Sequence, residues 1–249
     1  MASVSSISTD KSRAYSTSSS FNLTVLISGS GTNLQALIDA CGQAPPSKNK
    51  PAPRRTLTNA EISHVISNRR EAYGLARAQD AHIPVTYHNL LSYKKKHPDT
   101  EAGIQAARSQ YDTDLAQKIL THIPCPDLVI CAGWMHVLSP AFVNALASAN
   151  VPIINLHPAL PGKFNGADAI GRAYQAFQRG EISGTGVMVH YVVDEVDMGK
   201  PVLVKEVDMM SGESQKELEE RIHETEWKLI VEATGRVLHE LEEKRRTES

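Results

Sequence analysis

The chain has 249 residues, 41% of them hydrophobic, and a formal net charge of -2 at pH 7. This length predicts one domain, and the hydrophobic content is sufficient for a buried core. The small net charge provides no general attraction to nucleic acid or to an anionic membrane, so we expect neither as a partner.

The cysteines and the N-terminal region point to a cytoplasmic protein. Cys41, Cys125 and Cys131 are too few and too scattered for a disulfide framework or a zinc cluster, which is typical of a reducing compartment. No apolar run approaches the ~20 residues of a membrane span, and the N-terminus lacks the apolar region of a secretory signal.

Three segments are expected along the chain. Residues 1–20 contain nine serines and almost no apolar periodicity, so we expect a disordered tail. The basic residues of this tail also resemble a transit peptide faintly, but they form no amphipathic face. Residues 21–243 are interpreted as one folded domain, and residues 244–249 as a frayed C-terminus.

A glycine-rich turn follows the first predicted strand. The strand covers 23–27, the turn 28–33 and a helix 34–40. Glycines let successive N–H groups converge, and a helix N-terminus adds partial positive charge, so the turn predicts an anion site with Thr32 or Asn33 as the helix cap. The third glycine of a dinucleotide fingerprint is a leucine here, which favours a single phosphate monoester. A turn that binds nothing is the alternative.

The remaining pattern alternates strands with helices. Further strands are predicted over 61–67, 85–87, 127–132, 151–157, 184–193 and 201–207, and helices over 72–79, 105–120, 167–179, from Ser139 and from Ser214. Alternation of this kind predicts an α/β fold with a Rossmann-like, doubly wound, mostly parallel sheet. The last two strands are expected to form an antiparallel hairpin. The capping box at Ser214 and Glu217 opens a long final helix. Residues 43–56 and the lysines at 94–96 are interpreted as surface.

Asn155 and His157 lie at the end of one of these strands. Residues two apart in an extended backbone point the same way, and Pro158 cannot extend a central strand. The pattern therefore predicts an amide and an imidazole side by side at the carboxyl end of a strand, where α/β sheets bind ligands. An Asn can stabilise an oxyanion and a His can carry a proton. Taken alone, the same residues could form a turn without chemistry.

Asp197 is the candidate partner of His157. It lies in the polar turn between the two hairpin strands, and an anion near an imidazole stabilises the protonated form. An ordinary hydrophilic turn is the alternative. The chain has no Ser or Cys in a nucleophile-elbow motif and no His, Cys or Asp cluster at metal-ligand spacing, so we expect direct group transfer. In this transfer a bound phosphate would anchor one substrate, an Asn would polarise a carbonyl, and a His–Asp pair would move protons.

Five motifs occur in the order and spacing of the folate-dependent formyltransferases. They are Ser28-Gly-Ser-Gly-Thr-Asn-Leu-Gln35, Ala132-Gly-Trp-Met135, Asn155-Leu-His-Pro-Ala-Leu160, Gly184-Thr-Gly-Val187 and Asp194-Glu-Val-Asp197. The chain resembles this family from about residue 22 to 237. The resemblance implies transfer of the formyl group of 10-formyltetrahydrofolate to the amine of phosphoribosylglycinamide, in purine (IMP) synthesis. It also implies a monomer or homodimer that uses neither NAD nor a metal.

The resemblance also implies the roles of individual residues. Asn155 would hold the formyl oxygen, His157 would act as general acid and base, and Asp197 would raise the pKa of His157. The phosphate would be held by Ser30, Gly31, Thr32 and Asn33, and the folate by Met135, His136, Val137 and Leu138 together with Asn155. Glu226 would meet the ribose hydroxyls, although a solvated helix face is an equal alternative for it.

The chain departs from the bacterial pattern at three places. Thr113 and His136 replace arginines, and 168–170 replaces a His-x-His sequence. These departures weaken what the resemblance implies for the folate tail and for the turn at 162–166, which we expect to be mobile. His190 is interpreted as a satisfied histidine of the sheet, and a supporting role next to the site is the alternative.

Three other functions compete with the formyl transfer that the resemblance implies. A methionyl-tRNA formyltransferase would carry an additional basic domain, and a formyltetrahydrofolate hydrolase would carry an N-terminal regulatory domain. We expect neither, because the chain has an acidic last helix and only a serine-rich tail. A non-catalytic module that binds a nucleotide phosphate is the alternative from another class, and it would not need His157.

Overall fold

The computed structural model describes residues 20–45 and 54–248. The tail expected over 1–20 therefore lies, except for Ser20, outside the described residues, as does the middle of the 43–56 loop. The strands are β1 (Phe21–Ile27), β2 (Ala60–Ser67), β3 (Val85–Tyr87), β4 (Leu128–Cys131), β5 (Ile153–His157), β6 (Gly184–Tyr191) and β7 (Pro201–Asp208). The helices are α1 (Thr32–Cys41), α2 (Tyr73–Asp80), α3 (Leu90–Lys94), α4 (Glu101–Leu120), α5 (Pro140–Ser148), α6 (Ala169–Gln178) and α7 (Gln215–Thr247).

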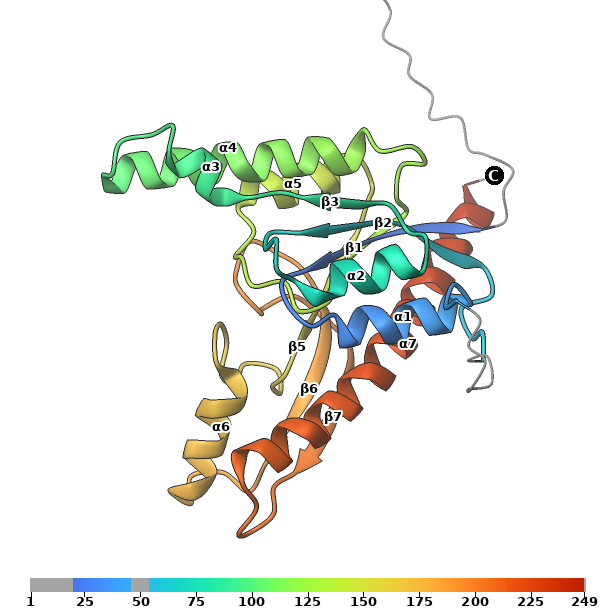
Figure 1. Ribbon diagram of the computed structural model, residues 1–249. Coiled ribbons are helices and arrows are strands. Elements are labelled where there is room, and N and C mark those ends of the chain that lie inside the picture. Colours follow the sequence, from blue (N-terminus) through green and yellow to red (C-terminus); the bar gives the residue numbers. More distant parts are fainter. Residues whose placement is uncertain (1–19, 46–53, 249) are drawn as a thin grey trace, which may run out of the picture.

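All the strands form one sheet in the order β3-β2-β1-β4-β5-β6-β7. The pairs among β1 to β5 are parallel, whereas β6 is antiparallel to both β5 and β7. The predicted mostly parallel, doubly wound sheet with a C-terminal hairpin and a long final helix is thus confirmed (Figure 1).

Helices cover both faces of the sheet and bury two apolar clusters. On one face, α1, α2 and α7 pack on alternate residues of β1, among them Leu23 and Val25. On the other face, α3, α4 and α5 pack on Leu26 of the same strand and on Val129 of β4. Because neighbouring residues of a strand point to opposite faces, an almost continuous apolar run such as β1 is what a strand buried on both sides requires.

The parallel strands bring three loops to one edge. β1 pairs with β4, and β4 pairs with β5, so the carboxyl ends of these three strands lie next to one another. The loops that follow them cover 28–31, 132–139 and 158–168. The sheet order therefore brings these three strand ends together at the edge of the sheet where α/β proteins bind ligands.

Two helix starts differ from the prediction. The helix expected from 105 begins at Glu101, because the side chain of Thr100 accepts a hydrogen bond from the N–H of Gly103 at 3.1 Å and caps the first turn. A short helix that was not predicted, α3, leads into the lysines at 94–96 and is capped by Asn89. These lysines are exposed, as predicted.

The final helix is longer than expected. It opens on the predicted capping box of Ser214 and Glu217, and it continues to Thr247 instead of fraying from residue 244. Arg245 explains the extension, because it forms an ion pair of 2.6 Å with Asp127 next to β4. Within the described part of the chain, no helix has both the length and the apolar composition needed to cross a membrane.

The packing of α7 against the sheet generates a stability prediction. Ile230 is fully buried in the cluster between α7 and the sheet. Ile230→Ala should lower the free energy of unfolding by about 2–5 kcal/mol, through lost burial and the cavity left behind. Urea unfolding measures the change. Lys228→Ala, on the exposed side of the same helix, is the matched control and should change it by less than about 0.5 kcal/mol. Equal effects of the two changes would contradict this account of the core.

Candidate active site

A cavity of about 470 Å³ lies at the carboxyl edge of the parallel strands. All the residues predicted for the site line it, namely Ser30, Gly31, Thr32, Asn33, Met135, His136, Val137, Leu138, Asn155, His157, Asp197 and Glu226. A second cavity of about 540 Å³ lies between α5 and α7, and none of these residues lines it. The structure therefore brings together residues that come from five separate regions of the sequence.

β5 places Asn155 and His157 in this cavity. The strand runs to His157 and ends before Pro158, as predicted. Asn155 lies opposite Cys131 of β4 on one side and opposite His190 of β6 on the other. His157 is 4% exposed. Its position on an inner strand, with sheet on both sides, fixes the direction in which the imidazole points.

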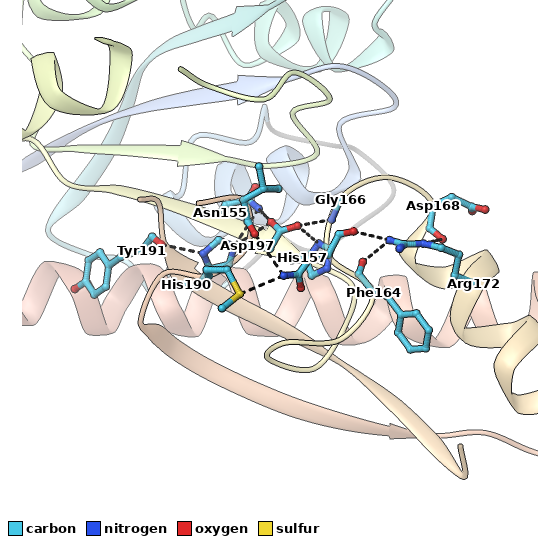
Figure 2. Close-up of polar contacts among 12 residues, drawn as sticks. Asn155, His157, Phe164, Gly166, Asp168, Arg172, His190, Tyr191 and Asp197 are labelled. Carbon is cyan, nitrogen blue, oxygen red and sulfur yellow. Dashed lines mark hydrogen bonds and ion pairs between the residues drawn. The ribbon is translucent and has the colours of Figure 1, made fainter. Parts of the chain in front are cut away.

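Asp197 lies beside both residues (Figure 2). Its Oδ2 is 3.4 Å from Nδ1 of His157, and its Oδ1 accepts a hydrogen bond from Nδ2 of Asn155 at 3.3 Å. The N–H of Gly166 donates to Oδ2 at 2.7 Å. The imidazole–carboxylate pair predicted from the sequence is therefore formed, at a separation longer than the roughly 2.7–3.2 Å of a usual hydrogen bond.

His190 is a buried sheet histidine whose two ring nitrogens both have partners, as expected, and it also supports the same cluster, which was the alternative. Its Nε2 lies 3.4 Å from Oδ1 of Asp197 and 3.2 Å from Nδ2 of Asn155. Its Nδ1 lies 2.9 Å from the carbonyl oxygen of Tyr191. This role depends on the register that sets Asn155 opposite His190, and no local pattern in the sequence specifies that register.

Burial and charge act in opposite directions on these groups. Burial lowers the pKa of His157 below 6.5, and the charge of Asp197 and contacts with the backbone at Lys163 and Phe164 raise it only in part. Asp197 raises the pKa of His157, as expected, but desolvation disfavours the charged ring more strongly, so the pKa still lies below its usual value. His157 is neutral at pH 7.

The same competition gives the opposite result for Asp197. Burial alone would raise the pKa of Asp197, but a hydrogen bond with His190, the N–H of Gly166 and, once it is protonated, the ring of His157 together hold it below the usual range. Asp197 is therefore ionised. With the carboxylate facing Nδ1, the proton of neutral His157 lies on Nδ1 and Nε2 carries a lone pair. Among the described residues, this buried Nε2 has no hydrogen-bond partner, and the ring lines the cavity.

The glycine-rich turn forms the other end of the cavity. Gly31, at φ 71°, is the residue that precedes α1, and no side chain caps the helix. The expected cap by Thr32 or Asn33 is therefore wrong, because both lie inside the first helical turn. Without a side-chain cap, the first N–H groups of α1 remain available to bind an anion. A Cβ on Gly31 would lie 2.5 Å from Cα of Gly74 in α2, so close packing requires glycine there.

Asn33 and Glu226 connect this turn to α7. Nδ2 of Asn33 donates to Oε2 of Glu226 at 3.2 Å. Glu226 is 6% exposed, which contradicts the alternative of a solvated helix face. Burial raises its pKa, and the hydrogen bond from Asn33 opposes that shift. Oδ1 of Asn33 is buried and has no partner among the described residues, which suits it to accept a hydrogen bond from a ligand.

His223 was missed in the sequence. It lies one helical turn before Glu226 on α7 and lines the cavity. The spacing of three residues, which puts two side chains on the same helix face, was the signal that could have found it.

The loop after β4 supplies an apolar wall. Met135 and Val137 are 72% and 63% exposed, whereas Leu138 is buried. His136 turns inward, with Nε2 at 2.8 Å from Oδ1 of Asp112. Thr113 is exposed on α4 and bonds the carbonyl of Ser109, so it contributes nothing to the cavity.

Ser28 joins this loop to the glycine-rich turn. Its hydroxyl accepts a hydrogen bond from the N–H of Met135 at 2.8 Å. Its own N–H donates to the carbonyl of Gly133 at 3.0 Å. The two loops that follow β1 and β4 are therefore connected by two hydrogen bonds through one residue.

Neither the buried cysteines nor a group of metal-binding side chains provides an alternative chemistry. Burial raises the pKa of the Cys41 and Cys131 thiols to about 12, so neither is a thiolate at neutral pH. Within residues 20–45 and 54–248, no three His, Cys, Asp or Glu side chains are grouped to hold a metal ion.

The opposing effects on His157 generate a prediction. Asp197→Asn should lower the pKa of His157 further, because it removes the charge that raises the pKa and leaves burial and His190, which lower it. Titration of the imidazole by NMR, with Asn155→Asp as a variant that adds a charge and should raise the pKa, measures the change. A pKa that stays the same or rises in Asp197→Asn would contradict the pairing.

Several known proteins similar to this chain carry the same activity in their names. Residues 21–234 match the family described as formyl transferase. The phosphoribosylglycinamide formyltransferase of Schizosaccharomyces pombe is 47% identical over 222 residues, which cover 87% of this chain and 97% of that protein. The Saccharomyces cerevisiae protein of the same name is 44% identical over 223 residues, covering 88% and 98%.

A solved structure has the same fold. The phosphoribosylglycinamide formyltransferase of Campylobacter jejuni superposes with a TM-score of 0.69 at 28% identity, over 88% of this chain and 97% of that one. The family match, the identity to the fungal relatives and the shared fold agree over most of the chain. This chain therefore belongs to the formyltransferase family, among the phosphoribosylglycinamide formyltransferases.

Proposed function

We propose that the protein transfers the formyl group of 10-formyltetrahydrofolate to the amine of N1-(5-phosphoribosyl)glycinamide. The products are formylglycinamide ribonucleotide and tetrahydrofolate, in the synthesis of IMP. The observation that carries the proposal is His157, whose ring lines the cavity and whose buried Nε2 has no hydrogen-bond partner among the described residues, while Asp197 faces Nδ1. A neutral imidazole with an ionised carboxylate behind it is what the removal of a proton from an attacking amine requires.

His157 would first act as a base. Its lowered pKa keeps Nε2 unprotonated at neutral pH, so it can take a proton from the substrate amine as the new C–N bond forms. The ring then becomes positively charged in a buried place. Asp197, which is ionised, would stabilise that charge through Nδ1. The same Nε2–H would afterwards give its proton to the nitrogen that leaves the formyl carbon, so that no proton is gained or lost overall.

Asn155 would stabilise the oxygen of the transferred group. Folate would supply an activated formyl carbon. As nitrogen adds to this carbon, negative charge develops on its oxygen, and a preoriented amide N–H is a suitable donor for it. Nδ2 of Asn155 lies 3.3 Å from Oδ1 of Asp197 and 3.2 Å from Nε2 of His190, which fix its orientation beside His157, and the formyl oxygen would replace one of these two partners.

The two ends of the cavity would separate the two substrates. The uncapped turn at Ser30, Gly31 and Thr32 has the N–H groups and helix terminus that suit a phosphate monoester. Asn33 and Glu226, joined by a hydrogen bond, would bind hydroxyl groups of the ribose. This arrangement needs no general positive charge on the protein, in keeping with the net charge of -2.

The loop after β4 would hold the folate. Its Met135 and Val137 present apolar surface at the cavity, and Leu138 closes the wall behind them, which suits a flat aromatic ring system. His136, held by Asp112, would fix the loop rather than contribute an arginine to the glutamate tail. The residues therefore fit the folate ring better than its charged end.

The setting of the reaction follows from the same proposal. We expect residues 21–243 to act as one catalytic domain, on small molecules alone, in the cytoplasm, and as a monomer or homodimer.

A coupled assay tests the function. Purified protein should convert 10-formyltetrahydrofolate to tetrahydrofolate only when the phosphorylated amine is present. His157→Ala should lower kcat by about 10²- to 10⁴-fold, because the proton acceptor is lost. Calorimetry should show that this variant still binds the phosphorylated amine, since the phosphate turn is unchanged.

His239→Ala is the matched control, because His239 is exposed near the end of α7 and should leave kcat unchanged. Wild-type protein that binds the phosphorylated amine without transferring formyl would support the non-catalytic phosphate-binding module instead. Turnover by His157→Ala at the wild-type rate would show that another group moves the proton.

A further inference from the structure

The loop between β5 and α6 has an unusual backbone path. Gly162, Phe164, Gly166 and Asp168 all have positive φ, at 72°, 49°, 84° and 53°. Glycine adopts this conformation readily, but Phe164 and Asp168 carry side chains that disfavour it. A loop with two such residues keeps one conformation only when contacts around it hold it in place.

Arg172 supplies these contacts from the first turns of α6 (Figure 2). Its Nη2 donates to the carbonyl of Phe164 at 2.5 Å and to the carbonyl of Asn165 at 2.8 Å. Its Nε lies 3.4 Å from the carbonyl of Asp168, and its guanidinium carbon lies 5.9 Å from the centre of the Phe164 ring. The guanidinium of Arg172 thus binds the carbonyls of the two strained residues, Phe164 and Asp168, and also the carbonyl of Asn165.

The loop between β5 and α6 in turn contacts the turn between β6 and β7, which carries Asp197. The N–H of Gly166 donates to Oδ2 of Asp197 at 2.7 Å. Nδ2 of Asn165 lies 3.5 Å from the carbonyl of Val196 and 3.3 Å from Sδ of Met198, on either side of Asp197. Asp197 itself has a positive φ of 58°, so the turn that carries it also depends on outside contacts.

We infer that Arg172 is a positioning residue, which holds the Phe164 and Asn165 carbonyls so that the Gly166 N–H points at Asp197 and fixes that carboxylate toward His157. Arg172 does not line the cavity, so it would act through the loop and not on a substrate. The shape of the guanidinium is essential, because a lysine ammonium at the same place is a single point charge without the planar fork. This inference rests on the proposed function for its meaning in catalysis, and on geometry alone for its effect on Asp197.

Two changes at Arg172 test the inference by steady-state kinetics. Arg172→Met should lower kcat by about 10- to 100-fold, because small displacements of reacting groups have effects of this size. Its KM for the phosphorylated amine should stay within about twofold of wild type, since the phosphate turn belongs to another loop. Arg172→Lys should keep the charge yet restore little of the lost kcat. Arg179→Met is the matched control at the end of α6, where Arg179 bonds only Glu181 among the described residues, and its kcat should not change.

The titration of His157 by NMR gives a readout that needs no substrate. The groups facing the ring are Asp197, His190 and the backbone at Lys163 and Phe164, and the backbone contacts raise its pKa. Release of the loop in either Arg172 variant should therefore shift the pKa of His157, because both the burial that lowers it and the backbone contacts that raise it would change, and Arg179→Met should leave it unchanged. Because this measurement is independent of turnover, it still tests the inference if wild-type protein shows no formyl transfer and the proposed function fails.

A double-mutant comparison separates positioning from general loss of structure. If Arg172 acts through Asp197, Arg172→Met should lower kcat far less in an Asp197→Asn protein than in the wild type. Equal losses in the two proteins would overturn the inference. So would wild-type kcat and an unmoved His157 titration in folded Arg172→Met, or in folded Arg172→Lys if the methionine variant does not fold.

Discussion

The carboxylate of Asp197 is the group on which the geometry of the site depends. It contacts His157, His190, Asn155 and the N–H of Gly166, which belong to two strands and a loop. A largely buried charge is tolerated only when several polar groups compensate it. The antiparallel turn between β6 and β7 therefore does more than end the sheet, because it delivers the one anion that holds the surrounding polar side chains in a fixed arrangement.

The burial of this cluster also decides its protonation. A histidine beside a carboxylate is usually expected to gain a proton more readily, and here desolvation outweighs that attraction. The carboxylate shows the reverse balance, with hydrogen bonds and neighbouring charge outweighing burial. His157 is therefore neutral and Asp197 is charged, although both side chains are largely buried. This division suits a site in which a proton must first be accepted and then returned.

Much of the fold follows from local patterns, and the cluster follows from them only in part. The alternation of strands and helices predicted the sheet. The spacing of Asn155 and His157, two residues apart before Pro158, predicted that their side chains lie side by side at the end of a strand. The role of His190 required the register of β5 on β6, which local sequence does not define. The uncapped turn at Gly31 was missed because polar residues beside it suggested a cap. The length of α7 was missed because its last turn is held by Asp127, which is distant in the chain.

Ser28 has a consequence for how the cavity works as a whole. Its hydroxyl and its N–H join the turn that faces the phosphate end to the loop that carries Met135. Neither segment can shift far without breaking a hydrogen bond to the other. The end of the cavity formed by the glycine-rich turn and the end formed by the loop after β4 are therefore one mechanical unit. On the proposed function, the backbone would set the distance between the two reactants.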